Sequence, residues 1–209
     1  TLKVFVSFLN DREMRMDEAT TERVLQDSMF ELDNLSAYLG KLKDMVCADE
    51  RETLLRPSAF NLRELVEKVV RLTNIPTGKK VSFSTAFPPD MPDLTADPVH
   101  VANVLSNLIE NAIKYSREEV DIDIVVLWNQ QGVELTVSDN GFGIAPDERR
   151  KVFDKFYRSS HLPDKQIPGI GLGLSYVRQI VEAHHGSVSL RSELGEGTRI
   201  TINLPTTAL

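Results

Sequence analysis

Short links between neighbouring strand-like segments restrict the fold of this chain more than any other feature. Ile122, Ile124, Val126 and Trp128 form one face of a strand, and apolar and polar residues alternate over residues 133–137, with only the polar residues 129–132 between the two segments. A second pair of such segments surrounds Gly195-Glu-Gly197. Links this short join antiparallel strands, whereas parallel strands need a crossover of about a dozen residues or more. The sequence therefore predicts hairpins where a doubly wound parallel sheet would need crossovers.

Helices accompany these strands. Apolar residues recur at helical spacing in three segments, which are residues 60–72, 97–115 and 172–185. Asn61 is a candidate N-cap, with Glu64 three residues later, and residues 81–87 alternate as a further strand. This mixture predicts an α+β fold, in which a mixed sheet packs on helices in a two-layer sandwich.

A heptad-like pattern precedes the globular part of the sequence. Its apolar positions step by four and three residues: Leu25, Met29, Leu32, Leu35, Leu39, Leu42 and Val46. A seam of this length requires a partner helix, so residues 1–50 are interpreted as part of a helical hairpin that dimerises. The alternative is a surface helix that packs on its own domain. Residues 51–59 are interpreted as a linker and residues 60–209 as one globular domain.

Charge and composition exclude several classes of function. The net charge of −7 and the pI of about 5.2 argue against binding to nucleic acid or to an anionic membrane surface. The single Cys47 excludes an internal disulfide and a cysteine-built metal site. No apolar run approaches the length of a membrane span, and no signal peptide is visible. Since the chain starts at Thr1 inside a patterned segment, we interpret it as a fragment.

Two carboxamides lie four residues apart on the predicted helix 97–115. Asn107 and Asn111 share one side of that helix with Lys114, because residues three or four apart are neighbours on a helix. Such a helix can hold amide oxygens and an ammonium group towards a metal ion and phosphates. The alternative is that the asparagines are solvated or hydrogen-bond locally.

A carboxylate with two glycines follows the strand that ends at Ser138. In Asp139-Asn-Gly141-Phe-Gly143 the carboxylate can accept a hydrogen bond from an exocyclic amine such as that of adenine. The glycines allow the backbone to approach a flat ring closely. The alternative is an ordinary Asp-Asn-Gly turn.

Three alternate glycines, Gly169, Gly171 and Gly173, open the predicted helix 172–185. Glycines leave backbone N–H groups accessible at a helix N-terminus, where the helix dipole favours anions. The spacing differs from that of a dinucleotide-binding motif, and the alternative is a flexible hinge.

An aromatic pair, Phe153 and Phe156, lies between the two glycine motifs. It suits an anchor for a lid over residues 159–168, which we expect to be mobile without nucleotide, and Arg158 can reach phosphates when such a lid closes. The alternative is that the aromatic pair packs in the core.

Taken in order, these motifs read Asn-x-x-x-Asn, Asp-x-Gly-x-Gly, Phe-x-x-Phe and Gly-x-Gly-x-Gly within about seventy residues. This order resembles the N, G1, F and G2 boxes of the ATP-binding domain of bacterial sensor histidine kinases, and the resemblance covers roughly residues 56–205. Residues 1–50 resemble the dimerisation and phosphotransfer hairpin of that family.

The resemblance implies ATP and Mg²⁺ as cofactors. Asn111 would coordinate Mg²⁺, Asn107 would lie near the γ-phosphate or polarise the acceptor, and Lys114 would contact phosphate; these three are the expected catalytic residues. Asp139 would bind the adenine amine, with Thr198 as a further contact on the adenine side. The full set of implied cofactor-binding residues is Asn107, Asn111, Lys114, Tyr115, Asp139, Gly141, Gly143, Ile144, Phe153, Arg158, Gly169, Gly171, Leu172, Gly173, Leu174 and Thr198.

The resemblance also implies partners and a location. It implies phosphate transfer to a histidine and then to the receiver domain of a response regulator, with a homodimer formed through the N-terminal helices. No nucleic-acid or membrane contact is expected of this chain, which is expected to be cytoplasmic whether or not the parent protein is anchored in a membrane. The family's acceptor histidine does not lie in residues 1–50, since the four histidines are His100, His161, His184 and His185. The chain is therefore expected to bind ATP without phosphorylating itself.

Two other functions stay open. Gyrase, Hsp90-type chaperones and mismatch-repair ATPases share this nucleotide fold and carry Glu where Asn107 stands, and an amide cannot activate water as a general base. Asn107 therefore favours phosphotransfer over a stand-alone ATPase. The absent histidine leaves room for a pseudokinase, a module that binds ATP or a partner without catalysis.

Overall fold

The computed structural model describes residues 55–129, 131–161, 167 and 169–205. The chain divides into two units, Thr1–Glu52 and Thr53–Leu209, and all described residues belong to the second. The predicted helical hairpin, residues 51–54 of the predicted linker and residues 162–166 and 168 of the predicted lid lie outside the described residues. None of the helices in the described part of the chain has the length and apolar content to cross a bilayer.

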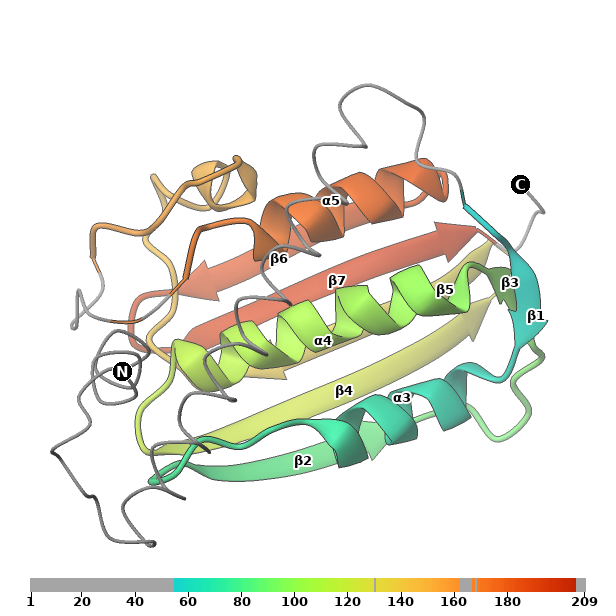
Figure 1. Cartoon of the computed structure of the whole chain (residues 1–209), viewed down its shortest axis with the longest axis horizontal. Coiled ribbons are helices and arrows are strands. Elements are labelled where there is room, and N and C mark those ends of the chain that lie inside the picture. Colours follow the sequence, from blue (N-terminus) through green and yellow to red (C-terminus); the bar gives the residue numbers. More distant parts are fainter. Residues whose placement is uncertain (1–54, 130, 162–166, 168, 206–209) are drawn as a thin grey trace, which may run out of the picture. The chain divides into compact units, whose positions relative to one another are not determined.

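A five-stranded mixed sheet forms one layer (Figure 1). In sheet order its strands are β2 (Lys80–Ala86), β4 (Glu119–Asn129), β5 (Gly132–Asp139), β7 (Gly197–Pro205) and β6 (Ser187–Glu193). Both predicted hairpins form, as β4 with β5 and β6 with β7, while β2 runs parallel to β4. The predicted mixed sheet is thus confirmed.

Three helices cover one face of this sheet (Figure 1). They are α3 (Leu62–Leu72), α4 (Pro98–Lys114) and α5 (Gly173–Ala183). The strands turn alternate side chains towards them, and Ile122, Ile124 and Val126 on β4 are buried while the residues between and beside them are exposed or half-buried. Burying one such side chain contributes roughly 1.5–3 kcal/mol, so the core between the two layers holds the predicted sandwich together.

The start of the domain differs from the prediction. Phe60 belongs to a short strand, β1 (Ser58–Phe60), which pairs antiparallel with β3 (Leu94–Ala96) in a separate two-stranded sheet. Helix α3 begins after it, and the predicted cap is present because the Asn61 side chain accepts a hydrogen bond from the N–H of Glu64 at 3.0 Å. The pairing partner of β1 lies more than thirty residues away along the chain, and no local pattern indicates it.

Helix α4, which carries the asparagine pair, is fixed at its N-terminus by a buried carboxylate. Asp97 accepts hydrogen bonds from the N–H groups of Val99, His100 and Arg56 at 2.8–3.1 Å. Burial alone would raise the pKa of Asp97, but the N–H groups of Arg56, His100 and Val99 outweigh burial and lower this pKa. The cap satisfies donors that a helix start otherwise leaves without partners.

Helix α5 is attached to the same point through His184, which follows its last residue. The Nε2 atom of this buried imidazole accepts from the N–H of Asp97 at 3.0 Å. Its Nδ1 atom lies 2.8 Å from the carbonyl oxygen of Ile180, which can only accept, so Nδ1 carries the proton. The end of α5 therefore holds the start of α4.

A lysine fixes the other end of α4. Lys79 Nζ donates to the carbonyl oxygens of Ser116 and Arg117 at 2.7 and 2.8 Å, directly after the helix. Burial lowers the pKa of Lys79, while Glu118 acts in the opposite direction. With both ends held, α4 presents its polar side at a defined place beside the sheet.

Candidate functional site

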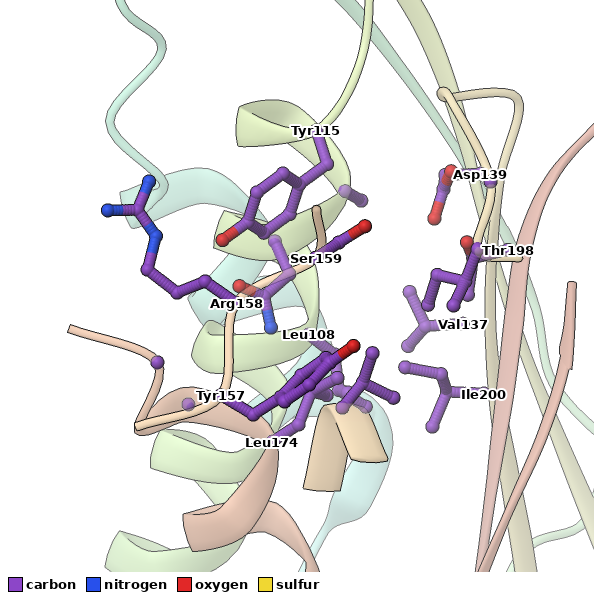
Figure 2. A pocket seen from close by; sticks show the side chains of 17 residues that line it. Leu108, Tyr115, Val137, Asp139, Tyr157, Arg158, Ser159, Leu174, Thr198 and Ile200 are labelled. Carbon is purple, nitrogen blue, oxygen red and sulfur yellow. The ribbon is translucent and has the colours of Figure 1, made fainter. Parts of the chain in front are cut away.

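A hollow of about 820 Å³, including space open to solvent at its mouth, lies between α4, α5 and the strands β5 and β7. Ten of the sixteen residues predicted for the site line it: Asn111, Tyr115, Asp139, Gly143, Ile144, Arg158, Gly171, Gly173, Leu174 and Thr198. Motifs that are up to 87 residues apart in the sequence therefore meet in one place. Figure 2 shows the side chains around this hollow.

The middle of the hollow is apolar. Leu108 from α4 and Leu174 from α5 line one side, and Val137 and Ile200 from the neighbouring strands β5 and β7 line the other (Figure 2). An apolar slot with few polar groups is typical of small-molecule sites, and this one suits a flat ring.

Asp139 is the polar group at the sheet side of this slot, next to Thr198 (Figure 2). Its Oδ1 atom accepts from the N–H of Gly141 at 2.8 Å, and the N–H of Thr198 also donates to the carboxylate. Burial nevertheless raises the pKa of Asp139 to about 6, because the two N–H donors only partly offset the loss of solvent. Near neutral pH the carboxylate is ionised and can accept a further hydrogen bond from a ligand.

The two glycines after Asp139 permit close packing of the loop. A Cβ atom on Gly141 would lie 2.5 Å from the carbonyl oxygen of Tyr115, and the N–H of Phe142 donates to that same oxygen at 2.9 Å. Gly143 has a φ of +70°, and a Cβ there would lie 1.9 Å from the carbonyl oxygen of Glu193. No larger residue fits at either place, so the Asp139 loop is clamped between the end of α4 and the end of β6.

The opposite end of the hollow leads to the N-terminus of α5. Leu172 precedes this helix without a side-chain cap, so the side chain of the cap residue does not occupy the first N–H groups of α5. Gly173 faces the asparagine pair, since a Cβ on it would lie 3.1 Å from Asn107 Oδ1 and 3.4 Å from Asn111 Nδ2. Free N–H groups at a helix start beside an amide form a site for an anion such as phosphate.

Six predicted residues do not line this hollow, although they lie near it. Asn107 is only 6% exposed, and its Nδ2 donates back to the carbonyl oxygen of Asn103 at 2.8 Å. Lys114 Nζ lies 4.7 Å from the centre of the Tyr115 ring and beside Gly169, where a Cβ would come within 2.1 Å of it. The other residues outside the lining are Gly141, Phe153, Gly169 and Leu172.

The aromatic pair is divided between core and surface. Phe153 is buried, with the guanidinium of Arg178 4.6 Å from its ring centre. Phe156 is 62% exposed and has a φ of +66°, and its N–H donates to the carbonyl oxygen of Gly171 at 2.9 Å. Phe156 therefore joins the aromatic motif to the Gly169–Gly173 motif through its backbone, while Tyr157, the next residue, lines the hollow.

Glu148 is a site-organising residue that the sequence analysis missed. Its carboxylate is 1% exposed and accepts hydrogen bonds from the side chains of Tyr157, Ser159 and Ser160 and from the N–H of Ser160. His161 Nδ1 also lies 3.2 Å from it. Although burial acts to raise it, these hydrogen bonds lower the pKa of Glu148 to about 2.

This network fixes the segment that brings Arg158 and Ser159 to the mouth of the hollow (Figure 2). Arg158 also donates to the carbonyl oxygen of Ile167. The only signal in the sequence is an acidic pair, Asp147 and Glu148, ahead of the serine pair Ser159 and Ser160, and this arrangement has no characteristic spacing.

A metal ion would find few protein ligands here. Among the described residues there is no cluster of three or more His, Cys, Asp or Glu side chains that could hold one. Asn111 places an amide at the hollow. This donor set fits Mg²⁺ held mainly by phosphates and water, because Mg²⁺ uses oxygen ligands and keeps several waters.

Comparison with known proteins agrees with this geometry. The family model described as "Histidine kinase-, DNA gyrase B-, and HSP90-like ATPase" matches residues 96–208. Sensor protein RprX of Bacteroides fragilis is 33% identical over 94% of this chain and 35% of its own length. The adaptive-response sensory kinase SasA of a Synechococcus strain is 32% identical over 93% of this chain and 52% of its own length.

The fold has solved relatives. The structure of full-length ShkA in complex with AMPPNP matches 96% of this chain and 41% of ShkA, with a TM-score of 0.76 and 22% identity. At that identity the likeness shows the fold alone. The chain spans about a third to a half of the length of the two curated relatives.

Proposed function

The chain belongs to the family of histidine kinase-, DNA gyrase B- and HSP90-like ATPases, and on this premise we propose that it is the ATP-binding catalytic module of a sensor histidine kinase. The observation that carries the proposal is the Asp139 carboxylate, held by backbone N–H groups at one end of an apolar slot whose other end meets the start of α5. The names of the curated relatives, a sensor protein and a sensory kinase, support the same function.

In this proposal ATP lies along the hollow. Its base occupies the slot and donates its amine to Asp139, while its phosphates reach the N-terminus of α5 and Asn111. Asn111 would hold Mg²⁺ through its amide oxygen, with Lys114 and Arg158 as cations for the phosphates. When bound, Mg²⁺ supplies positive charge that neutralises the phosphate oxygens.

The chain's own residues favour transfer over hydrolysis. Asn107 is an amide and cannot take a proton from water, and its NH₂ group is already bonded to Asn103. The γ-phosphate would pass to a histidine and then to an aspartate on the receiver domain of a response regulator. Since none of the four histidines lies in residues 1–50, the proposed acceptor is supplied from outside these 209 residues.

The cellular setting follows from this chemistry. A module that uses ATP and passes phosphate to a regulator works in the cytoplasm, and we assign the chain to that compartment. Dimerisation of the parent protein through residues 1–50 belongs to the same proposal.

Asn111→Ala provides the test. We expect calorimetry to show ATP binding to the native chain in Mg²⁺, and about a tenfold loss in the variant, an effect typical of residues that support a metal site. In EDTA the loss should be smaller. Asn203→Ala is the matched control, because Asn203 lies on β7 outside the hollow and its side chain makes a 3.4 Å hydrogen bond to Ser187.

Three outcomes would contradict the proposal. Absence of ATP binding by the folded native chain would remove the nucleotide site itself. Equal losses with and without Mg²⁺ would contradict the role of Asn111. Steady phosphate release that Asn107→Ala abolishes would indicate a stand-alone ATPase.

A further inference from the structure

The hydroxyl of Ser192 connects the parts of the chain that surround the proposed base. Ser192 lies on β6, is 7% exposed and does not itself line the hollow. Its Oγ lies 2.6 Å from the carbonyl oxygen of Gly197, 2.8 Å from the N–H nitrogen of Ile144 and 3.0 Å from Thr198 Oγ1. One buried hydroxyl thus touches the Asp139 loop and the start of β7.

The number of protons on each group determines the direction of these bonds. A serine hydroxyl has one proton and two lone pairs. The carbonyl of Gly197 can only accept, so it takes the Ser192 proton, and the N–H of Ile144 can only donate. The contact with Thr198 is then possible only if the Thr198 hydroxyl donates to Ser192. Thr198 therefore faces the hollow with lone pairs and no proton.

We propose that Ser192 is a positioning residue that sets the base specificity of the hollow through Thr198. Asp139, as a carboxylate, and Thr198, with its proton turned away, both present only acceptors to a base. A purine with an amine at this edge matches them, whereas a purine with a keto oxygen meets acceptors on both sides. The inference rests on the proposed function and adds a determinant of its selectivity.

ATP and ITP are suitable probes, because they differ at the amine or keto position and share sugar and phosphates. We expect the native chain to prefer ATP. In Ser192→Ala the Thr198 hydroxyl is free to rotate and can donate to the keto oxygen, so the preference for ATP should fall about tenfold, mainly through tighter binding of ITP. The control is Ser189→Ala, an exposed serine on the same strand opposite Thr201, which should keep the native ratio.

Thr198→Val separates this role from general loosening of the loop. It removes the acceptor without adding a donor, so it should weaken ATP and should not weaken ITP. If Ser192 acts through Thr198, adding Ser192→Ala to Thr198→Val should change the ratio no further. Both nucleotides are measured on one sample, so a reduced folded fraction cancels in the ratio.

The outcomes separate failure of the proposed function from failure of the role of Ser192. A native chain that binds neither nucleotide overturns the proposed function and this inference together. A native chain that binds both equally, or an unchanged ratio in Ser192→Ala, overturns the inference and leaves nucleotide binding intact. If Ser192→Ala changes the ratio of ATP to ITP affinity further in the Thr198→Val background, Ser192 does not act through Thr198, and the inference is overturned.

Discussion

Asp139 carries a charge that its surroundings disfavour. Burial raises the pKa of its carboxyl to about 6, although the N–H groups of Gly141 and Thr198 donate to it. An aspartate in an unfolded chain ionises near its ordinary pKa of about 4. Ionised Asp139 therefore lowers the stability of the empty protein at neutral pH, as is common where a functional group is placed for a ligand.

We expect Asp139→Asn to bind ATP about ten- to a hundredfold more weakly, since a charge-assisted hydrogen bond is lost. Calorimetry on both chains measures this loss.

The Asp139→Asn variant should also be more stable than the native chain, with a free energy of unfolding higher by about 1 kcal/mol at pH 7.5, a value reduced for the partial exposure of the group. The folded state holds the proton more tightly than the unfolded state, so native stability rises as the pH falls from about 6 towards 4. The advantage of the variant should accordingly shrink on acidification. Denaturant unfolding at pH 7.5 and pH 5 measures the difference in free energy of unfolding between the variant and the native chain. A difference that grows at pH 5 would contradict the raised pKa of Asp139.

At the scale of elements, α4 and α5 act as one unit because each is tied to the other away from the hollow. His184 at the end of α5 accepts from the N–H of Asp97, the residue that caps α4. The N-terminus of α5 and the asparagines of α4 lie together at the hollow. Fixing the helices at one end therefore helps to set the distance between the phosphate-binding groups at the other.

The hydrogen bond from Asp97 to His184, which connects α4 to α5, should be sensitive to pH. Burial lowers the pKa of His184, although Asp97 and the Ile180 carbonyl act against this. The folded state disfavours the proton, so the stability contributed by neutral His184 is present above its unfolded pKa of about 6.5 and is lost as the pH falls below it.

We predict that His184→Gln lowers the free energy of unfolding by about 1–2 kcal/mol at pH 7.5, because buried hydrogen bonds are lost. The difference from the native chain should narrow at pH 5. His185→Gln is the control, since His185 is exposed and follows the helix end with a φ of 56°. A difference that is constant between pH 7.5 and pH 5 would show that His184 does not titrate in this range.

For the whole molecule, every described part of the site comes from one stretch of chain. Both sheets, the three helices and all residues that line the hollow lie between residues 55 and 205. The unit boundary falls between Glu52 and Thr53. We propose that residues 53–209 form an independent domain.

The shortened chain 53–209 is expected to unfold in one cooperative transition, and its dissociation constant for Mg-ATP should lie within about threefold of the value for the full 209 residues. Thermal unfolding followed by circular dichroism, and calorimetry on both chains, would measure this. A shortened chain without a cooperative transition, or one with much weaker binding, would show that residues 1–52 contribute to the fold or the site.

Local patterns predicted much of this protein. The hairpins follow from alternation and short links, and the Asn61 cap follows from a residue type beside a helical pattern. Asp139, Asn111 and three of the glycines, which line the hollow, were predicted as site residues because the chemistry expected of them depends on near neighbours in the sequence. Such features need only a few adjacent residues, so they leave a spacing that can be recognised.

Tertiary structure alone decided the rest. The pairing of β1 with β3, the burial of Glu148 and the contact of Ser192 with Thr198 and Ile144 each join segments through a particular packing of side chains. Packing also decides that Asn107 lies outside the lining of the hollow, although Asn107 shares a helix face with Asn111. A periodic pattern states which side of an element is apolar. It does not state which partner from elsewhere in the chain reaches a given atom, because that depends on how all the layers close together.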